Sequence, residues 1–294
     1  MQQFGQLVVS ALPFGAIYAL AALGLVAILK TSDMVNFAFG ALGTLTAYIF
    51  WTFWSVVGLP IWAAWIIALL CALIMGVVVD RLVTSHLRSA PVVVTIVATL
   101  GVFLVVEGTM GIIWGHSPKR IPPVISPREG DALRFFGFFL SGHDVFTLVL
   151  TAVLVGLLYW VYERTRVGIA LRAVAQDRET ASLMGISAER YISASWAVGG
   201  LLVGVAAILI APAIALAPTQ LNSVVLFAFA GAILGGFGSF VGALVGGLLV
   251  GIVANLVAGY LSPNLQLSII FLLIVLVLYV RPQGIFGREV EVRA

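Results

Sequence analysis

Few side chains in this 294-residue sequence could do chemistry, and none of them has the neighbours that a reaction would need. The three histidines lie in loops, at spacings that do not match a metal site: His86, His116 and His143. Neither lysine follows a glycine, so no run ends in the Gly-Lys-Ser/Thr of a nucleotide-binding loop. The sequence therefore predicts no catalytic set, no metal site and no cofactor bound to this chain.

Composition instead predicts a membrane protein. Hydrophobic residues make up 62% of the chain and charged residues 9%, with a mean hydropathy of +1.17. A soluble domain carries roughly 45–50% apolar and about 25% charged residues. A soluble fold could not cover its surface with so few polar groups, so lipid must be the solvent. The net charge of +3 does not indicate a nucleic-acid partner, because the basic residues gather in loops at membrane edges.

Nine apolar runs could cross the bilayer, since one span needs about 20 apolar residues. Two of them, 35–57 and 222–236, could be broken or re-entrant, which the bilayer tolerates where the backbone is buried in protein. We therefore expect an all-α polytopic transmembrane helical bundle of eight or nine spans, in a single domain over 1–294. The runs cover 7–29, 35–57, 60–79, 92–115, 144–162, 191–216, 222–236, 238–260 and 264–280.

The distribution of basic residues predicts the orientation, because cytoplasmic loops carry the excess of Lys and Arg. With nine spans and the N-terminus outside, the inner segments 30–34, 80–91, 163–190 and 281–294 hold eleven of the 15 basic residues. The other four lie in the external loop 116–143: Lys119, Arg120, Arg128 and Arg134. This orientation places 163–190 in the cytoplasm.

A short internal sequence match favours an inverted repeat. Residues 35–39 read VNFAF and residues 225–229 read VLFAF, and both precede a run rich in Gly and Ala. The two spans run in opposite directions in the expected topology, and inverted repeats are common in transporters. A five-residue match also arises easily by chance in so apolar a chain.

The segment 163–190 is the long charged island of the sequence. It should form two short helices, 167–175 and 178–184, with Asp177 as the N-cap of the second and Gly185 just past its end. Two turns of helix are unstable alone in water, so the second helix needs a partner for its apolar side. That partner could be another protein or the membrane surface. The apolar side consists of Ala181, Leu183, Met184 and Ile186.

The run GGFGSFVGALVGGLLVG (235–251) is the second distinctive segment. Gly238, Gly242 and Gly246 form small-xxx-small steps, and Gly247 with Gly251 forms another. Such steps let helix backbones approach closely in lipid. The run predicts tight internal packing, or else a thin wall beside a transport pathway.

Glu107 is the one carboxylate well inside an apolar run. An ionisable group at membrane depth is costly and normally faces the bundle interior or water. Glu107 could lie on a pathway or carry a proton, or it could pair with another helix or lie near the outer headgroups. Asn36 and Asn255 are also polar within apolar runs, and interhelical hydrogen bonds are their simplest explanation.

Taken together, these motifs resemble the branched-chain amino acid permease family of ABC importers, and its LivH half rather than its LivM half. The resemblance covers nearly the whole chain and depends most on the island and the glycine run. Shorter matches are YALAALG (18–24), NFAFG (36–40), ATLG (98–101) and RPQG (281–284) followed by FG (286–287). Phe39 stands where the family often has His, Val241 where it often has Pro, and Asn255 where Glu is common.

The resemblance implies a transport subunit rather than an enzyme. It assigns coupling to an ATPase to the island, at Asp177, Thr180, Ala181, Met184 and Gly185. The candidate pathway residues are Asn36 and Glu107, which are polar within apolar runs, together with Phe39 and Asn255, where the sequence departs from the family pattern near the presumed pathway. The resemblance also implies a location in the bacterial inner membrane. The implied partners are a second, LivM-like permease, two cytoplasmic ATPase subunits that hydrolyse ATP, and an external substrate-binding protein.

Two other functions remain open at this point. A urea or short-amide permease of the same broad group would share these motifs. A proton-coupled secondary transporter would use Glu107 as its coupling site but would not need the segment 177–186. An integral-membrane enzyme is disfavoured by the missing catalytic residues.

Overall fold

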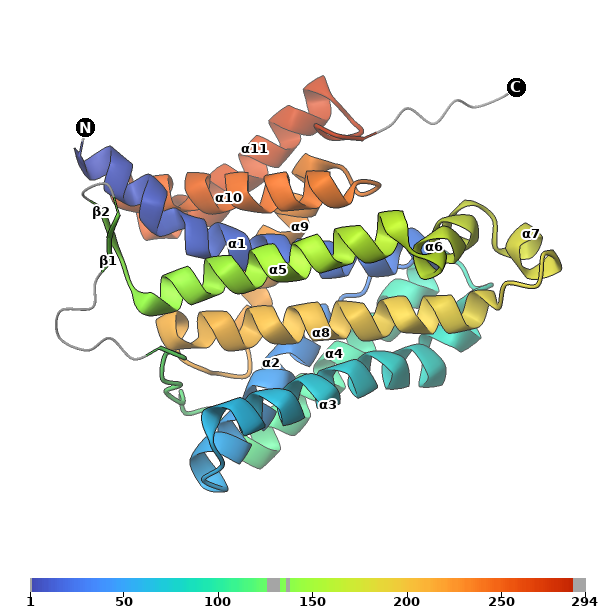
Figure 1. Ribbon diagram of the computed structural model, residues 1–294, viewed down its shortest axis with the longest axis horizontal. Helices are drawn as coiled ribbons and strands as arrows, with labels where there is room; N and C mark the ends of the chain where they lie inside the picture. The colour runs from blue at the N-terminus through green and yellow to red at the C-terminus, as the bar shows by residue number, and fades with distance from the viewer. Residues whose placement is uncertain (1, 126–132, 136–137, 288–294) are drawn as a thin grey trace.

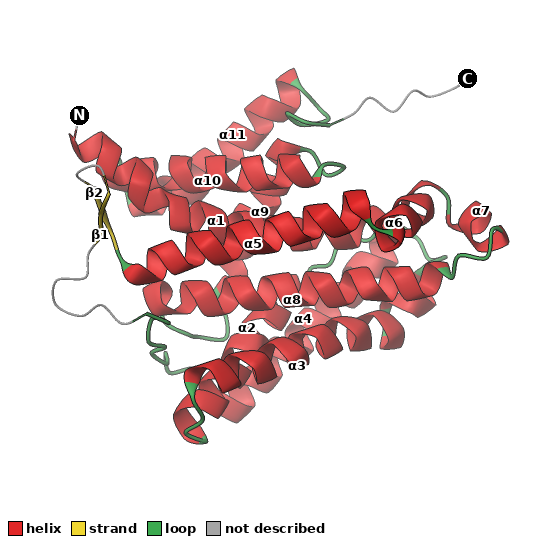
Figure 2. Ribbon diagram, in the orientation of Figure 1, coloured by secondary structure: helices red, strands yellow, loops and turns green. Residues whose placement is uncertain are grey.

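The computed structural model describes residues 2–125, 133–135 and 138–287 and shows a helical bundle (Figures 1 and 2). A two-stranded antiparallel hairpin, β1 (Leu133–Phe135) and β2 (Phe138–Leu140), precedes α5. The helices are α1 (Gln2–Ser32), α2 (Phe39–Trp51), α3 (Ile61–Leu82), α4 (Val92–Trp114), α5 (Gly142–Arg164), α6 (Arg166–Gln176), α7 (Arg178–Leu183), α8 (Ala188–Ile214), α9 (Leu221–Gly235), α10 (Phe240–Tyr260) and α11 (Gln266–Val280).

Each predicted apolar run is a helix, which confirms the all-α polytopic bundle. Within the described residues, seven helical segments are long and apolar enough to cross a membrane: α1, α3 with the 3-10 turn Thr84–Leu87 after it, α4, α5, α8, α10, and α11 with the 3-10 turn Pro263–Leu265 before it. The two runs that could be broken or re-entrant contain shorter helices. α2 ends at Trp51 and continues as a π-helical turn, Thr52–Val56, and α9 has only 15 residues.

The helices differ sharply in burial although all are apolar. In the most apolar stretch of α1 83% of the residues are buried, and in α8 67%, against 11% in α4, α5 and α11. α1 contacts α5, α8, α9 and α10, while α8 contacts α2 and α3. At the centre, a Cβ on Gly24 of α1 would lie 3.1 Å from the Gly199 oxygen of α8, and one on Gly199 would lie 3.0 Å from the Gly24 oxygen. α1 and α8 therefore form the core, and the other helices surround them.

The segments predicted to share one side of the membrane do meet at one end of the bundle. Arg178 pairs with Asp33 at 2.7 Å, and Arg88 lies 3.9 Å from Glu189. The Ile285 amide donates to the Leu234 carbonyl at the same end. The β1–β2 hairpin lies at the opposite end from α6 and α7 (Figure 1). Three of the basic residues used to predict the orientation lie outside the described residues: Arg128, Arg288 and Arg293.

The internal sequence match does not lie at equivalent positions of two repeats. Residues 35–39 end at the first residue of α2, whereas 225–229 lie in the middle of α9. The two segments instead contact each other, since the rings of Phe37 and Phe229 stack with centroids 6.0 Å apart. The match therefore supplies no evidence for a repeat.

Candidate coupling segment and transport pathway

The charged island folds as two helices joined at a capped corner, as its sequence predicted. The Asp177 carboxylate accepts hydrogen bonds from the amides of Glu179 (2.9 Å) and Thr180 (3.0 Å), and from the Thr180 hydroxyl (2.7 Å). The hydrogen bonds from Thr180 lower the pKa of the Asp177 carboxyl below its ordinary value. Gly185 has a φ of +83°, which glycine adopts without strain, and ends α7. These bonds fix the backbone of a helix that has only six residues.

The apolar side chains of the α7 region face in two directions. Ala181 is only 4% exposed, and Ile186 packs against the core of the chain. Leu183 and Met184 are 88% and 79% exposed. The expectation that all four face a partner is therefore wrong for Ala181 and Ile186, because these two attach α7 to its own subunit. Leu183 and Met184 are the residues left to contact another molecule.

α7 is also attached to the loop after α1. The Arg178 guanidinium donates to the Asp33 carboxylate at 2.7 Å, and Asp33 is largely exposed. α6 is fixed to α5 by Thr165, whose hydroxyl donates to the Val161 carbonyl of α5 at 2.6 Å and accepts from the Gly168 amide of α6 at 3.2 Å, and by Arg172, which donates to the Tyr162 carbonyl. α7 is therefore attached directly to the α1–α2 connection, and through α6 to α5.

A buried polar cluster that sequence reasoning missed lies at the same end of the bundle. Asp80 is fully buried near the end of α3 and accepts two hydrogen bonds from Arg88, both 3.1 Å long. The hydroxyl of Thr84 donates to it at 2.9 Å, and that of Ser193 from α8 also donates. A buried carboxylate needs such partners, because an unpaired charge at this depth is costly. The cluster joins α3, the α3–α4 connection and α8.

The glycine run packs helices at backbone distance, on two sides of α10. A Cβ on Gly242 would lie 2.2 Å from the Gly235 oxygen of α9, and one on Gly246 would lie 2.0 Å from the Gly231 oxygen. Gly247 and Gly251 face α1 instead, where a Cβ would lie within 2.5 Å of backbone atoms of Ala19 and Gly15. Gly238 does not belong to this contact. It lies in the turn before α10, and nothing is within 4 Å of where its Cβ would be.

Three of the four proposed pathway residues have contacts inside the chain. Asn36 is 1% exposed; its side-chain amide oxygen accepts from the Ala38 amide at 2.9 Å, and its side-chain nitrogen is buried without a hydrogen-bond partner among the described residues. Phe39 is fully buried against Gly24, so its ring fills the core and does not line a pathway. Asn255 of α10 donates to the Leu7 carbonyl (2.6 Å) of α1 and thereby joins the two helices.

Glu107 differs from the other three. It lies two turns before the end of α4, and its side chain is partly exposed. Its Oε2 atom is buried and has no hydrogen-bond partner among the described residues. The structure therefore gives Glu107 no pairing with another helix within those residues.

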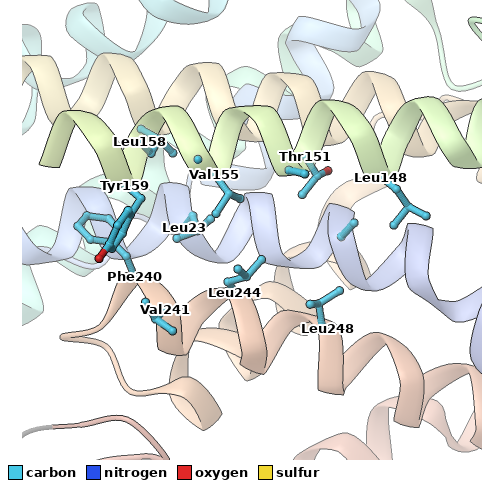
Figure 3. A pocket seen from close by; sticks show the side chains of 13 residues that line it. Leu23, Leu148, Thr151, Val155, Leu158, Tyr159, Phe240, Val241, Leu244 and Leu248 are labelled. Carbon is cyan, nitrogen blue, oxygen red and sulfur yellow. The ribbon is translucent and has the colours of Figure 1, made fainter. Parts of the chain in front are cut away.

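Two grooves of the bundle differ in chemistry. One, of about 540 Å³, lies between α5 and α10 over α1 (Figure 3). Its lining includes Leu148, Val155 and Leu244 and carries no charged side chain; the polar side chains in it are Thr151 and Tyr159. The other, of about 400 Å³, lies between α4 and α11 and includes the amide of Asn222. Among the described residues, no three His, Cys, Asp or Glu side chains are grouped as metal ligands.

Comparison with known proteins decides the family. Residues 7–279 match the family described as "Branched-chain amino acid transport system / permease component". The chain belongs to this permease family. It is a multi-pass membrane permease subunit.

Curated relatives extend over the same length. The LivH permease protein of Salmonella typhimurium, named as part of a high-affinity branched-chain amino acid transport system, is 27% identical over 98% of this chain and 97% of its own. BraD of Pseudomonas aeruginosa, from a system of the same name, is 29% identical over 97% of both chains. Among solved structures, PsaBC from Streptococcus pneumoniae in complex with Fab is 12% identical, with a TM-score of 0.46, over 90% of this chain and 89% of that one.

Proposed function

We propose that this chain is the LivH-like permease of an ATP-driven importer that carries branched-chain amino acids across a bacterial inner membrane. In this proposal it works with a second, LivM-like permease, two cytoplasmic ATPase subunits and an external substrate-binding protein. The observation that carries the proposal is α7. The chain belongs to a family of transport permeases. α7 presents an exposed surface in water that is suited to contact with an ATPase subunit.

The exposed part of α7 has the composition of a docking surface. Leu183 and Met184 project from a helix at the end of the bundle, where Figure 1 shows α7 beyond α8. Large apolar side chains gathered on a projecting element mark interaction sites. A methionine side chain also adapts easily to a partner groove. Asp177, Thr180 and Gly185 fix the backbone that presents these two side chains, and Ala181 attaches it to the subunit.

The proposal includes nine membrane crossings with the N-terminus outside. α2 with its π-helical turn is one crossing, and α9 with the irregular segment 215–220 is another. In this topology α1–α4 and α8–α11 follow the same order: a long helix, a short helix and two further helices. Corresponding helices of the two groups cross the membrane in opposite directions. This correspondence supports an inverted repeat of four helices, with α5 and the segment 163–190 between the halves and the loop 116–143 outside.

Glu107 is the observation that favours a second function, a proton-coupled secondary transporter. A partly exposed carboxylate inside a span, with one oxygen atom lacking a partner among the described residues, resembles a proton-binding group. Such a transporter has no need for Leu183 and Met184 to be exposed in water. We therefore assign Glu107 to pathway polarity or subunit contact and assign energy coupling to α7.

The substrate is tested best in the reconstituted complex. Leucine, isoleucine, valine, urea and a short amide would each be added with the binding protein, and ATP hydrolysis would be measured. We expect the three branched-chain amino acids to stimulate hydrolysis and urea and the amide to leave it at the basal rate. Stimulation by urea or the amide alone would assign the chain to that other substrate class.

A further inference from the structure

The groove between α5 and α10 has the length of one membrane leaflet. Figure 3 shows Leu148 and Leu248 at one end of it and Tyr159 and Phe240 at the other. Leu148 and Tyr159 lie eleven residues apart on α5, which at about 1.5 Å per residue is roughly 16 Å. The hydrocarbon core of a bilayer is about 30 Å thick, so one leaflet is roughly 15 Å. The length of the groove therefore matches that of an acyl chain in one leaflet.

The width of the groove also suits an acyl chain. A volume of about 540 Å³ over this length gives a cross-section of roughly 34 Å². A helix about 10 Å in diameter fills roughly 80 Å², so the groove is too narrow for a helix of another protein to enter. The space exists because small residues line it: Ala16 of α1 and the exposed Ala152 and Gly156 of α5. Thr151, which also lines it, is only 4% exposed.

The end of the groove at Tyr159 has the composition of a lipid headgroup region. A smaller pocket of about 110 Å³ shares Leu158 and Phe240 with the groove and is lined by Lys30 and Tyr162. The Lys30 ammonium lies 4.7 Å from the centroid of the Tyr162 ring and 5.2 Å from that of the Phe240 ring. Tyrosine rings gather at the level of the headgroups, and lysine extends its ammonium toward them along apolar surface.

Positive charge exceeds negative charge at this end. The Arg172 guanidinium carbon lies 5.3 Å from the centroid of the Tyr162 ring, and Arg164 and Arg166 are exposed where α5 meets α6. The one acidic residue within 159–176 is Glu163, whose carboxylate lies 3.4 Å from the Arg172 guanidinium. Lys30 adds a fourth positive charge. This balance is complementary to a phosphate, and basic pockets between helices at a membrane surface bind anionic headgroups.

α6 has the composition of a helix that lies on the membrane surface. Val167 and Ile169 are 46% and 59% exposed, and Arg166 beside them is exposed as well. Val167 and Leu171 line the smaller pocket. A helix that combines exposed apolar residues with basic ones lies in the interface and is attracted to anionic lipids. α6 therefore lies where a headgroup at the end of the groove would be.

We propose that the groove and the smaller pocket form a binding site for one anionic phospholipid. One acyl chain lies between α5 and α10 over α1, and the phosphate lies beside Lys30 and Arg172. The bound lipid fills the space between α5 and α10 and holds the start of α6 at the membrane surface. The site requires a membrane around the chain but no particular substrate, so it does not depend on the importer proposed above.

Photolabelling in vesicles of defined composition tests the site. The full-length chain, with the subunits that purify with it, would be reconstituted in phosphatidylcholine containing a trace of a phospholipid with a diazirine on its acyl chain. The probe would be a phosphatidylglycerol, which is anionic, in one sample and a phosphatidylcholine, which is zwitterionic, in the other. Labelled peptides would be located by mass spectrometry. The reference is the peptide around Ile74 of α3, a side chain that is 60% exposed.

We expect the anionic probe to label 148–159 and 240–248 at least about fivefold more than the zwitterionic probe, relative to the reference peptide. Equal labelling of the groove by the two probes would overturn the anionic site. Labelling of the reference peptide without labelling of the groove would show that protein, and not lipid, covers the groove, and would overturn the proposal as well.

A matched pair of charge variants tests the headgroup contact. Lys30→Gln and Arg81→Gln each remove one positive charge at the same end of the bundle, and Arg81 is exposed at the end of α3. We expect Lys30→Gln to reduce the preference for the anionic probe about fivefold, which corresponds to the ~1 kcal/mol that one basic residue contributes near an anionic surface. Arg81→Gln should keep the preference of the parent. An equal preference in the two variants would contradict the contact with Lys30.

A matched pair of glycine variants tests the acyl chain without changing any charge. Gly156→Leu and Gly108→Leu add the same side chain at exposed glycines with nothing within 4 Å of the added Cβ, on α5 and α4. Gly156 lines the groove and Gly108 does not. We expect Gly156→Leu to lose most of the labelling of 240–248 and Gly108→Leu to retain it. Full labelling of 240–248 in Gly156→Leu would show that the acyl chain does not lie in the groove.

Discussion

α10 and α7 are held in place by opposite means. α10 packs its backbone against α9 and α1 through glycines, at distances where a single added Cβ would overlap a neighbouring backbone. α7 is held by the Asp177 cap, the ion pair from Arg178 to Asp33 and the buried Ala181. The difference follows from the two solvents. In lipid, close van der Waals packing stabilises helix pairs, whereas in water a short helix needs polar contacts and keeps apolar side chains only where a partner covers them.

This comparison predicts that changes in the two regions will fail differently. A change in the glycine contacts should reduce the amount of folded protein. A change on the outer side of α7 should leave the protein folded and inserted but alter its coupling to ATP hydrolysis.

The largest effect should come from Gly242→Leu. A Cβ there would lie 2.2 Å from the Gly235 oxygen, so α9 and α10 would have to separate. Overpacking typically costs about 1–3 kcal/mol, and a backbone neighbour cannot move aside as a side chain can. We expect loss of most of the folded protein, measured as the monodisperse fraction after detergent extraction. Gly238→Ala is the control, because its Cβ has open space; equal losses in both variants would show that the α9–α10 contact is not responsible.

The next effect concerns the buried cluster at the end of α3. Asp80→Ala leaves the Arg88 guanidinium without its carboxylate, and breaking a buried pair costs about 3–5 kcal/mol. We expect a lower melting temperature of the purified complex. The double variant Asp80→Leu with Arg88→Met removes both charges and should recover much of the loss. If the double variant is less stable than Asp80→Ala, the Asp80–Arg88 pair stabilises the fold by more than the neutralisation of each charge by the other.

A smaller effect on stability, but a clear one on coupling, should follow from Arg178→Asp. The pair with Asp33 is solvent-exposed, and such pairs contribute only about 0–1 kcal/mol to stability. We expect normal amounts of complex but reduced uptake per ATP hydrolysed, because α7 would no longer be held to the α1–α2 connection. Adding Asp33→Arg restores the pair in reverse and should recover coupling. Unchanged coupling in Arg178→Asp would show that the contact between Arg178 and Asp33 is not needed for coupling.

The smallest effect should be that of Glu107→Gln. Glutamine keeps the shape and hydrogen-bonding capacity of the side chain but cannot titrate. We expect most ATP-dependent uptake to remain, with the apparent affinity for leucine changed by less than about tenfold, or ~1.4 kcal/mol. Uptake that follows a proton gradient without the ATPase subunits, and that Glu107→Gln abolishes, would instead support the secondary transporter.

The features that local sequence determines were predictable. Each apolar run is a helix, and the two runs suspected of being unusual are the short helices α2 and α9. The Asp177 cap and the turn at Gly185 followed from side-chain chemistry within a few residues. Gly238 was misplaced because α10 begins only at Phe240, and helix boundaries are the least certain part of such predictions.

The direction in which each side chain faces was not predictable in the same way. In a bundle surrounded by lipid, the outward and inward faces are both apolar, so the pattern that marks a buried face in water is absent. Phe39 was placed on a pathway although its ring fills the core, and Ala181 was placed on a docking surface although it is buried. Asp80 was read as part of a loop, and its burial depends on Arg88 and on Ser193 of another helix.

The central claim is that energy from ATP reaches this subunit through α7, and one measurement tests it most directly. ATP hydrolysis and leucine uptake would be measured in the same proteoliposomes for the complete complex with Met184→Asp, and with Ser187→Asp as a control that adds the same charge at an exposed position just past α7. We expect Met184→Asp to lose uptake and its link to hydrolysis while the permease remains inserted, and Ser187→Asp to behave as the parent. Normal leucine uptake per ATP in Met184→Asp would show that energy does not reach the subunit through α7.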